Sequence, residues 1–159
     1  MFLKPDYNLK SIYDINFEEL KSKGIKVLFF DLDSTLMKSK TGVYTERTLE
    51  WLDSFQRDFI VAVLSNNFNK SYIEKVQGIS SFDVVGAANK PNPQILFEFL
   101  KNVRIEPSQA AMIGDRPLTD ILAGKRAGCM TILVDSISAA EEGLPTRAVR
   151  WLERLSIKR

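Results

Sequence analysis

Five short apolar runs recur along the chain, and segments with a helical pattern separate them. A run that is apolar at every position is typical of a strand buried on both faces, as in a parallel sheet covered by helices. Alternating strands and helices of this kind build doubly wound folds. The sequence therefore predicts an α/β fold with a mainly parallel five-stranded sheet. Its predicted strands are residues 25–32, 60–65, 84–88, 110–114 and 130–134.

The intervening segments carry signals for where helices begin and end. Asn16 and Glu19 form a capping box, Asn69 has the residue type of an N-cap, and Asn92 precedes Pro93, which suits a first helical position. Short gaps between strands leave no room for a large cap domain. The predicted helices are residues 16–24, 45–56, 69–78, 92–103, 117–128 and 146–158.

The composition narrows the possible classes. With 159 residues, 45% of them hydrophobic, residues 1–159 are expected to form a single domain with its own core. A formal net charge of +2 gives no reason to expect nucleic-acid binding. The apolar runs are strand-sized, so we expect a cytoplasmic protein, with peripheral attachment to a membrane as an alternative.

The absence of histidine is the most restrictive feature of the composition. It excludes serine–histidine triads, phosphohistidine chemistry and zinc sites with histidine ligands. Cys129, the one cysteine, cannot be the nucleophile of a C-x5-R phosphatase loop, because Asp135 stands where that loop has arginine. Acid–base chemistry must therefore use carboxylates, lysines or tyrosines.

Polar side chains follow four of the five predicted strands. Ligands of doubly wound sheets bind at the carboxyl ends of the strands, so we expect these side chains to meet at one edge. In chain order they are Asp31 and Asp33, Ser65 and Asn66, Lys90, and Asp115.

The types of these residues suit phosphoryl transfer to a carboxylate. Asp31 and Asp33 alternate along an extended chain and would lie on one side, where two acids so close need a cation. Mg²⁺ prefers oxygen ligands and keeps positions for phosphate and water, and Asp115 would add a further carboxylate. Lys90 suits a phosphoryl group, and the hydroxyls and backbone of Ser65 and Thr35 offer further hydrogen-bond donors, with Asn66 beside them.

Four segments, "DLDSTL", "LSNN", "NKPNP" and "IGDRPLTD", occur in the order and strand placement of the haloacid-dehalogenase (HAD) superfamily motifs, which the chain resembles. The stretches "SIYDINFEELKSKGIKVLFFDLDSTL" and "GDRPLTDILAGKRAGCMTILV" extend this resemblance to the YqeG-like branch of subclass IIIA. That branch is similar to the phosphatidylglycerophosphate phosphatases of mitochondria and photosynthetic organisms.

The resemblance implies a Mg²⁺-dependent phosphatase that works through an aspartyl-phosphate intermediate. Asp31 would be the nucleophile, and Asp33 would be the general acid and then the general base. The phosphate-binding group would comprise Thr35, Ser65, Asn66 and Lys90, Mg²⁺ would be held by Asp31, Asp115 and the carbonyl of Asp33, and Asp120 would support the metal or Lys90. The chain departs from the family at Arg116, where members often have Gln, at residues 123–125, and in lacking an aromatic residue after the first motif.

Alternatives stay open for substrate and function. An uncapped site suits a large or surface-presented substrate, such as a phospholipid head group at a membrane or a phosphorylated protein, although a soluble ester is an alternative. A receiver-like binding module is a rival, but it would need a carboxylate after the third predicted strand, where the chain reads "VVGAANK". A catalytically silent scaffold is the other rival.

The closing helix has an apolar stripe beside several basic residues. Such a helix could lie on an anionic membrane. The alternative expectation is that Trp151 packs against its own sheet or forms a homodimer contact. The stripe is Ala148, Trp151, Leu152 and Leu155, and the basic residues are Arg147, Arg150, Arg154 and Lys158.

Overall fold

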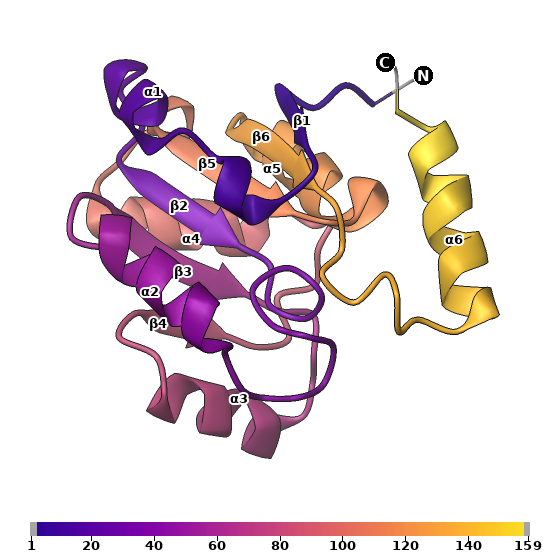
Figure 1. Cartoon of the computed structure of the whole chain (residues 1–159). Coiled ribbons are helices and arrows are strands. Elements are labelled where there is room, and N and C mark those ends of the chain that lie inside the picture. Colours follow the sequence, from indigo (N-terminus) through magenta and orange to yellow (C-terminus); the bar gives the residue numbers. More distant parts are fainter. Residues whose placement is uncertain (1–2, 158–159) are drawn as a thin grey trace.

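The computed structural model describes residues 3–157 and contains one six-stranded sheet (Figure 1). The strand order is β1-β6-β5-β2-β3-β4, and all neighbouring strands pair in parallel. The sheet is thus a parallel one built through crossover connections. The strands are β1 (Tyr7–Leu9), β2 (Val27–Phe30), β3 (Ile60–Leu64), β4 (Asp83–Val85), β5 (Ala110–Gly114) and β6 (Met130–Val134).

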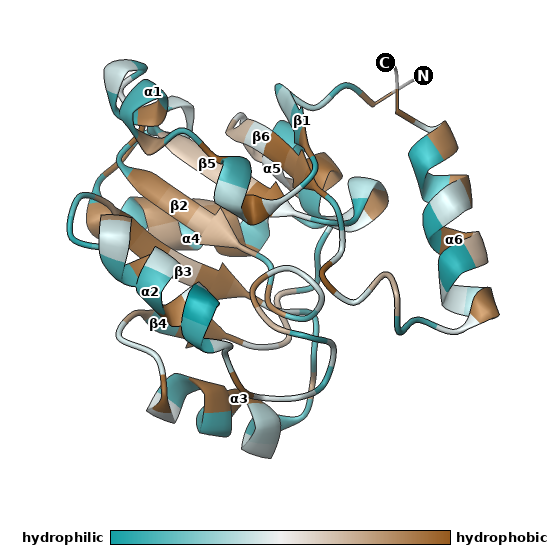
Figure 2. Cartoon of the chain, in the orientation of Figure 1, coloured by the Kyte–Doolittle hydropathy of each residue, from teal (hydrophilic) through white to brown (hydrophobic). Residues whose placement is uncertain are grey.

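Strand β2 lies inside the sheet and is buried at all four positions. Its side chains alternate between the two faces: Val27 and Phe29 belong to one apolar cluster, while Leu28 and Phe30 belong to the other. Figure 2 shows the corresponding brown colour along β2, β3 and β5. A strand that is apolar on both faces requires helices on both faces, which explains the continuous apolar run in the sequence.

Helices cover each face of the sheet. Leu52 and Phe55 of α2 and Val76 of α3 pack into the cluster with Phe30, whereas Leu96 of α4 packs into the opposite cluster. The α-helices are α1 (Phe17–Ser22), α2 (Glu46–Phe55), α3 (Lys70–Gly78), α4 (Gln94–Val103), α5 (Leu122–Ala127) and α6 (Leu144–Leu155). Three short turns complete the fold: η1 (Ile12–Asp14), η2 (Pro107–Gln109) and the π-helical η3 (Pro117–Ile121).

The predicted doubly wound fold without a large cap is confirmed, but the predicted number of strands is wrong. The missed strand, β1, has only three residues, "YNL", and pairs with β6 at the edge of the sheet. Its register with β6 is set by residues more than 120 positions away, so no local apolar run marks it. Within residues 3–157, no helix is both long and apolar enough to cross a membrane.

Helix α6 stands apart from the helices that cover the sheet (Figure 1, yellow). Trp151 is 63% exposed, so the expectation that it packs against its own sheet is wrong. The part of the predicted helix at Lys158 lies outside the described residues. Ion pairs with residues that follow β5 and β6 attach α6 to the rest of the protein.

Candidate active site

The register of β2 with its two neighbours, β3 and β5, brings the carboxyl ends of these three strands together. Phe30 is aligned with Val63 of β3 and Ile113 of β5, and the Asp31 backbone N–H donates to the Ile113 carbonyl at 2.9 Å. Asp31 and the residues that follow Leu64 and Gly114 therefore leave the sheet at one edge. This is the edge at which parallel α/β sheets bind their ligands.

Lys90 is the central cation of this edge. Its Nζ atom lies 2.7 Å from Asp31 Oδ1 and 2.7 Å from Asp120 Oδ1, and its side chain is 1% exposed. The Asp120 side chain is also 1% exposed and that of Asp31 is 14% exposed, and hydrogen bonds between oppositely charged groups are short and strong. Lys90 therefore holds the Asp31 carboxylate in one orientation and links it to Asp120.

Asp120 reaches Lys90 because of the backbone around it. It lies in the π-helical turn η3, and its Oδ2 accepts a hydrogen bond from the Arg116 N–H at 3.1 Å. A Cβ atom added to Gly114 would lie 2.3 Å from Asp120 Oδ2. Glycine at the end of β5 thus leaves the space that the Asp120 carboxylate occupies.

Asp115 is held by side chains from two other parts of the chain. Thr35 Oγ1 donates to Asp115 Oδ1 at 2.9 Å, and Arg150 of α6 forms an ion pair with Asp115 Oδ2. Asp115 is only 2% exposed, and Thr35 is fully buried. Thr35 therefore orients an acidic side chain, while its predicted role in phosphate binding stays a prediction.

Burial raises the pKa of all three clustered acids above their usual value. The negative charge of Asp115 raises the pKa of Asp31 further, whereas Lys90 lowers it. In the same way, the charge of Asp120 raises the pKa of Asp115, whereas Arg150 lowers it. Burial and the Asp31 charge raise the pKa of Asp120 to about 6, against the effect of Lys90. Burial alone would lower the pKa of Lys90, but Asp120 and Asp31 raise it above its usual range.

Three carboxylates, those of Asp31, Asp115 and Asp120, share this edge with two paired cations, Lys90 and Arg150. Asp31, Asp115 and Asp120 each offer an oxygen, and these atoms lie within 4.8 Å of one another. Hard oxygen ligands at this spacing, with a net negative charge, suit Mg²⁺. The residues present therefore fit the cation that the motifs predict. Asp120 also forms an ion pair with Lys90.

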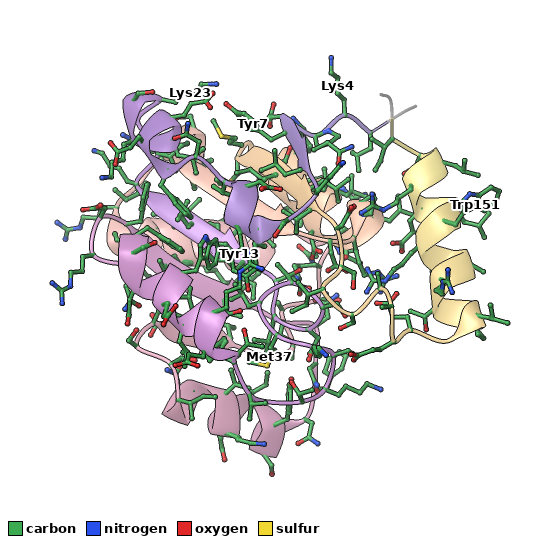
Figure 3. The ribbon with its side chains drawn as sticks, in the orientation of Figure 1. Lys4, Tyr7, Tyr13, Lys23, Met37 and Trp151 are labelled. Carbon is green, nitrogen blue, oxygen red and sulfur yellow. The ribbon has the colours of Figure 1, made fainter. Side chains whose placement is uncertain are left out.

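Asp33 is not a member of this cluster of three acids, and two donors hold its side chain. Its Oδ1 atom accepts from the Tyr72 hydroxyl at 2.6 Å and from the Lys40 backbone N–H at 2.8 Å. The Tyr72 hydroxyl also contacts Met37, which Figure 3 labels within the loop after β2. Burial and the Asp33 carboxylate raise the pKa of Tyr72, so Tyr72 remains a donor at neutral pH.

Ser65 and Asn66 shape the loop after β3. Ser65 Oγ accepts from the Asn67 N–H at 3.1 Å. The Asn66 amide donates to the Lys90 carbonyl and accepts from the Lys90 N–H, both at 2.8 Å. Asn66 thus fixes the backbone that carries Lys90, and its predicted contact with phosphate stays a prediction, as does that of Ser65.

Comparison with known proteins agrees with this geometry. The HAD-hydrolase-like family model matches residues 87–150. A probable phosphatase, YqeG, from Bacillus subtilis is 31% identical over 153 residues, which cover 96% of this chain and 88% of the relative. The chain belongs to the HAD-like hydrolase family.

A second relative of this HAD-like chain is longer. Phosphatidylglycerophosphate phosphatase 1 of Arabidopsis thaliana is 30% identical over 99% of this chain, which spans 48% of the plant protein. The predicted YqeG-like membership and the predicted class, a HAD-type phosphatase, are thereby confirmed.

Solved structures show the same fold. An uncharacterized protein from Listeria monocytogenes has a TM-score of 0.59 at 20% identity, covering 69% of this chain and 78% of its own. A 2-haloacid dehalogenase from Pseudomonas syringae has a TM-score of 0.54 at 16% identity, with 80% and 99% covered.

Three residues of this HAD-type site were missed in the sequence. Tyr72 contacts an acid 39 positions earlier, and Arg150 contacts one 35 positions earlier, so neither forms a local motif. Gly114 is the glycine of the motif "GD", and a glycine directly before an acid at a strand end was the available signal for a close approach. Asp31, Lys90, Asp115 and Asp120 do come together as the motifs predicted.

Arg116, one of the departures from the family, forms an ion pair with helix α6. Its guanidinium contacts Glu153 through Nη2 at 2.5 Å and Nε at 3.2 Å. Arg154 of α6 pairs with Asp135 at 2.7 Å. The helix is therefore attached by its charged side, which is the physical reason that Trp151 does not face the sheet.

Proposed function

We propose that the protein is a Mg²⁺-dependent phosphomonoester hydrolase that forms an aspartyl phosphate on Asp31. The observation that carries the proposal is the Lys90 ammonium at 2.7 Å from Asp31, beside two further acids at the end of a buried strand. A carboxylate oriented by a lysine is a competent nucleophile toward phosphorus. Its relatives named as phosphatases support the same reaction class.

In the first step, an Asp31 oxygen attacks phosphorus in line with the ester oxygen, and the bond from phosphorus to that oxygen breaks. Asp33 gives its proton to the departing alkoxide. We assign this transfer to Asp33 Oδ2, because Oδ1 is held by Tyr72 and the Lys40 N–H. Lys90 favours the ionised form of Asp31 and would stabilise the charge that develops on the phosphoryl oxygens.

In the second step, Asp33 takes a proton from water while the water oxygen attacks phosphorus. The bond between phosphorus and Asp31 breaks, which releases inorganic phosphate and restores the carboxylate. Mg²⁺, held by Asp31, Asp115 and the Asp33 carbonyl, would neutralise phosphate charge and the excess of carboxylates. Ser65 and the backbone near Thr35 would donate to phosphoryl oxygens, and Asn66 would keep Lys90 in place.

We propose phosphatidylglycerophosphate as the substrate and a peripheral position at a membrane. The plant relative carries that activity in its name, and only α3 (Lys70–Gly78) and β4 intervene between β3 and Lys90. A site without a large lid suits a head group presented by a surface. A soluble or protein phosphoester is the alternative substrate.

The test is phosphate release in Mg²⁺ by the wild type and by Asp31→Asn. Substrates are phosphatidylglycerophosphate in mixed micelles, p-nitrophenyl phosphate and a panel of soluble monoesters. The matched control is Asp83→Asn, which removes an exposed acid at the start of β4. The proposal predicts that the lipid is preferred and that only Asp31→Asn is inactive.

Other outcomes separate the parts of the proposal. Preference for a soluble ester would contradict the lipid substrate and leave the reaction intact. Equal activity of Asp31→Asn and the wild type would contradict the reaction itself, and absence of turnover on every ester would favour a silent scaffold.

A further inference from the structure

Helix α6 is attached to the rest of the protein through its charged side. Arg150 pairs with Asp115, Glu153 with Arg116, and Arg154 with Asp135. Glu153 is the buried residue of the helix, at 6% exposure. An amphipathic helix of a globular protein ordinarily turns its apolar side inward, so the orientation of α6 is reversed.

The opposite side of α6 is an apolar stripe that faces solvent. Its members recur at spacings of three or four residues, which places them on one side of the helix. Exposure is 80% for Leu144, 63% for Trp151, 59% for Leu152 and 54% for Leu155. Figure 3 shows Trp151 on the side of α6 that points away from the sheet. The structure adds Leu144 to the four residues predicted from the sequence, so the apolar stripe comprises Leu144, Ala148, Trp151, Leu152 and Leu155.

Arginine predominates among the charged residues beside the apolar stripe, where Arg154 pairs with the exposed Asp135. Arg147 is exposed on its flank, whereas Glu153 and Glu142 are both directed toward arginines, Arg116 and Arg150 respectively. A second copy of the chain would bring the same positive flank to the contact. A surface with anionic groups over an apolar interior complements both features, and tryptophan is enriched where such surfaces meet water.

The position of the stripe relates it to the active site. Arg150, on the inward side of α6, contacts Asp115, so the outward stripe lies about one helix diameter, roughly 10–12 Å, from the carboxylate cluster. We propose that the apolar stripe of α6 docks on an anionic phospholipid bilayer. This inference rests on the proposed function for its purpose, because docking would hold the site beside phosphorylated head groups.

The experiment is co-sedimentation with vesicles of mixed phosphatidylcholine and phosphatidylglycerol, compared with phosphatidylcholine alone. The variant is the double substitution Trp151→Gln with Leu155→Gln. The control is Leu49→Gln with Ile79→Gln, which removes two apolar side chains, 44% and 48% exposed, outside α6. We expect the wild type and the control to bind the anionic vesicles and the α6 variant to bind at least about tenfold more weakly.

Fluorescence provides a second measurement that needs no change in the stripe. The chain has two tryptophans, so Trp51→Phe leaves Trp151 as the reporter, and its emission should shift to shorter wavelength on anionic vesicles. The proposal would be overturned if the α6 variant bound vesicles as well as the wild type, or if the Trp151 emission did not shift. It would also be overturned if the wild type formed a dimer that the α6 variant abolished.

Hydrolysis of p-nitrophenyl phosphate distinguishes this inference from the proposed function. The α6 variant should retain it, because Trp151 and Leu155 contact neither Asp31 nor Lys90. Vesicle binding without turnover of any ester would support the docking proposal and contradict the proposed phosphatase activity. Turnover without vesicle binding would support the phosphatase activity and contradict the docking proposal.

Discussion

Replacing Lys90 with methionine should destabilise the metal-free protein strongly. Lys90 Nζ lies 2.7 Å from both Asp31 Oδ1 and Asp120 Oδ1, and the Lys90 and Asp120 side chains are each 1% exposed. Methionine keeps most of the side-chain volume, so the substitution removes mainly the charge. Two buried carboxylates would then lose their counter-ion.

The magnitude follows from the distances. At an effective dielectric constant of about 20, two unit charges 2.7 Å apart interact by roughly 6 kcal/mol. Desolvation of the lysine offsets much of this attraction, and removal of one partner from a buried pair typically costs about 3–5 kcal/mol. We therefore expect the free energy of unfolding of Lys90→Met to fall by about 3–5 kcal/mol at pH 7.5.

The loss should shrink as the pH falls. The pKa of Asp120 is raised from 3.8 to about 6, so this group stabilises the fold fully below pH 3.8, and its contribution is lost as the pH rises through about 6. Removing Lys90 raises the pKa of Asp120 further, because the cation that opposed the rise is gone. Protonation at pH 5 should thus relieve much of the repulsion in the variant.

Urea unfolding in EDTA, followed by circular dichroism at pH 5 and pH 7.5, measures both effects. Lys125→Met is the matched control, since Lys125 pairs with Asp6 at 2.9 Å with side chains 34% and 42% exposed. An exposed pair contributes about 0–1 kcal/mol. A Lys90→Met loss no greater than that of the control, or one equal at the two pH values, would refute this view of the cluster.

Two further substitutions test how the site is held. Tyr72→Phe should lower kcat for p-nitrophenyl phosphate about tenfold with little change in KM, because Asp33 loses a 2.6 Å hydrogen bond; unchanged kcat would count against it. Arg150→Gln should tighten Mg²⁺ binding, measured by calorimetry without substrate, because the Arg150 guanidinium pairs with Asp115 and competes with the cation for that carboxylate. The control Arg147→Gln removes an exposed arginine and should leave the Mg²⁺ affinity unchanged. Equal Mg²⁺ affinities in the two variants would contradict the competition between Arg150 and Mg²⁺ for Asp115.

The sequence was most informative where chemistry is local. Apolar runs that end in "DLD" and "GD" predicted strand ends and acids together, because burial on both faces of a sheet leaves a clear pattern. Asp31 and Asp115 were found in this way, Lys90 was found as the polar residue after the third predicted strand, and Asp120 followed from the resemblance to the HAD family.

Contacts between distant segments could not be read from such patterns. Strand β1 is too short to show an apolar run, and Tyr72 meets Asp33 only because α3 packs beside the loop after β2. The stripe containing Trp151 was recognised, but its direction depends on ion pairs with Asp115 and Arg116, which belong to another part of the chain.

The central claim is that Asp31 carries the phosphoryl group during turnover. Rapid acid quenching of the wild type with p-nitrophenyl phosphate and Mg²⁺, followed by borohydride reduction and peptide mass spectrometry, would locate an acyl phosphate as a reduced aspartate. The account predicts the modified residue at position 31 in the wild type and its absence in Asp31→Asn. A modified residue elsewhere, or phosphate release at the wild-type rate from Asp31→Asn, would contradict it.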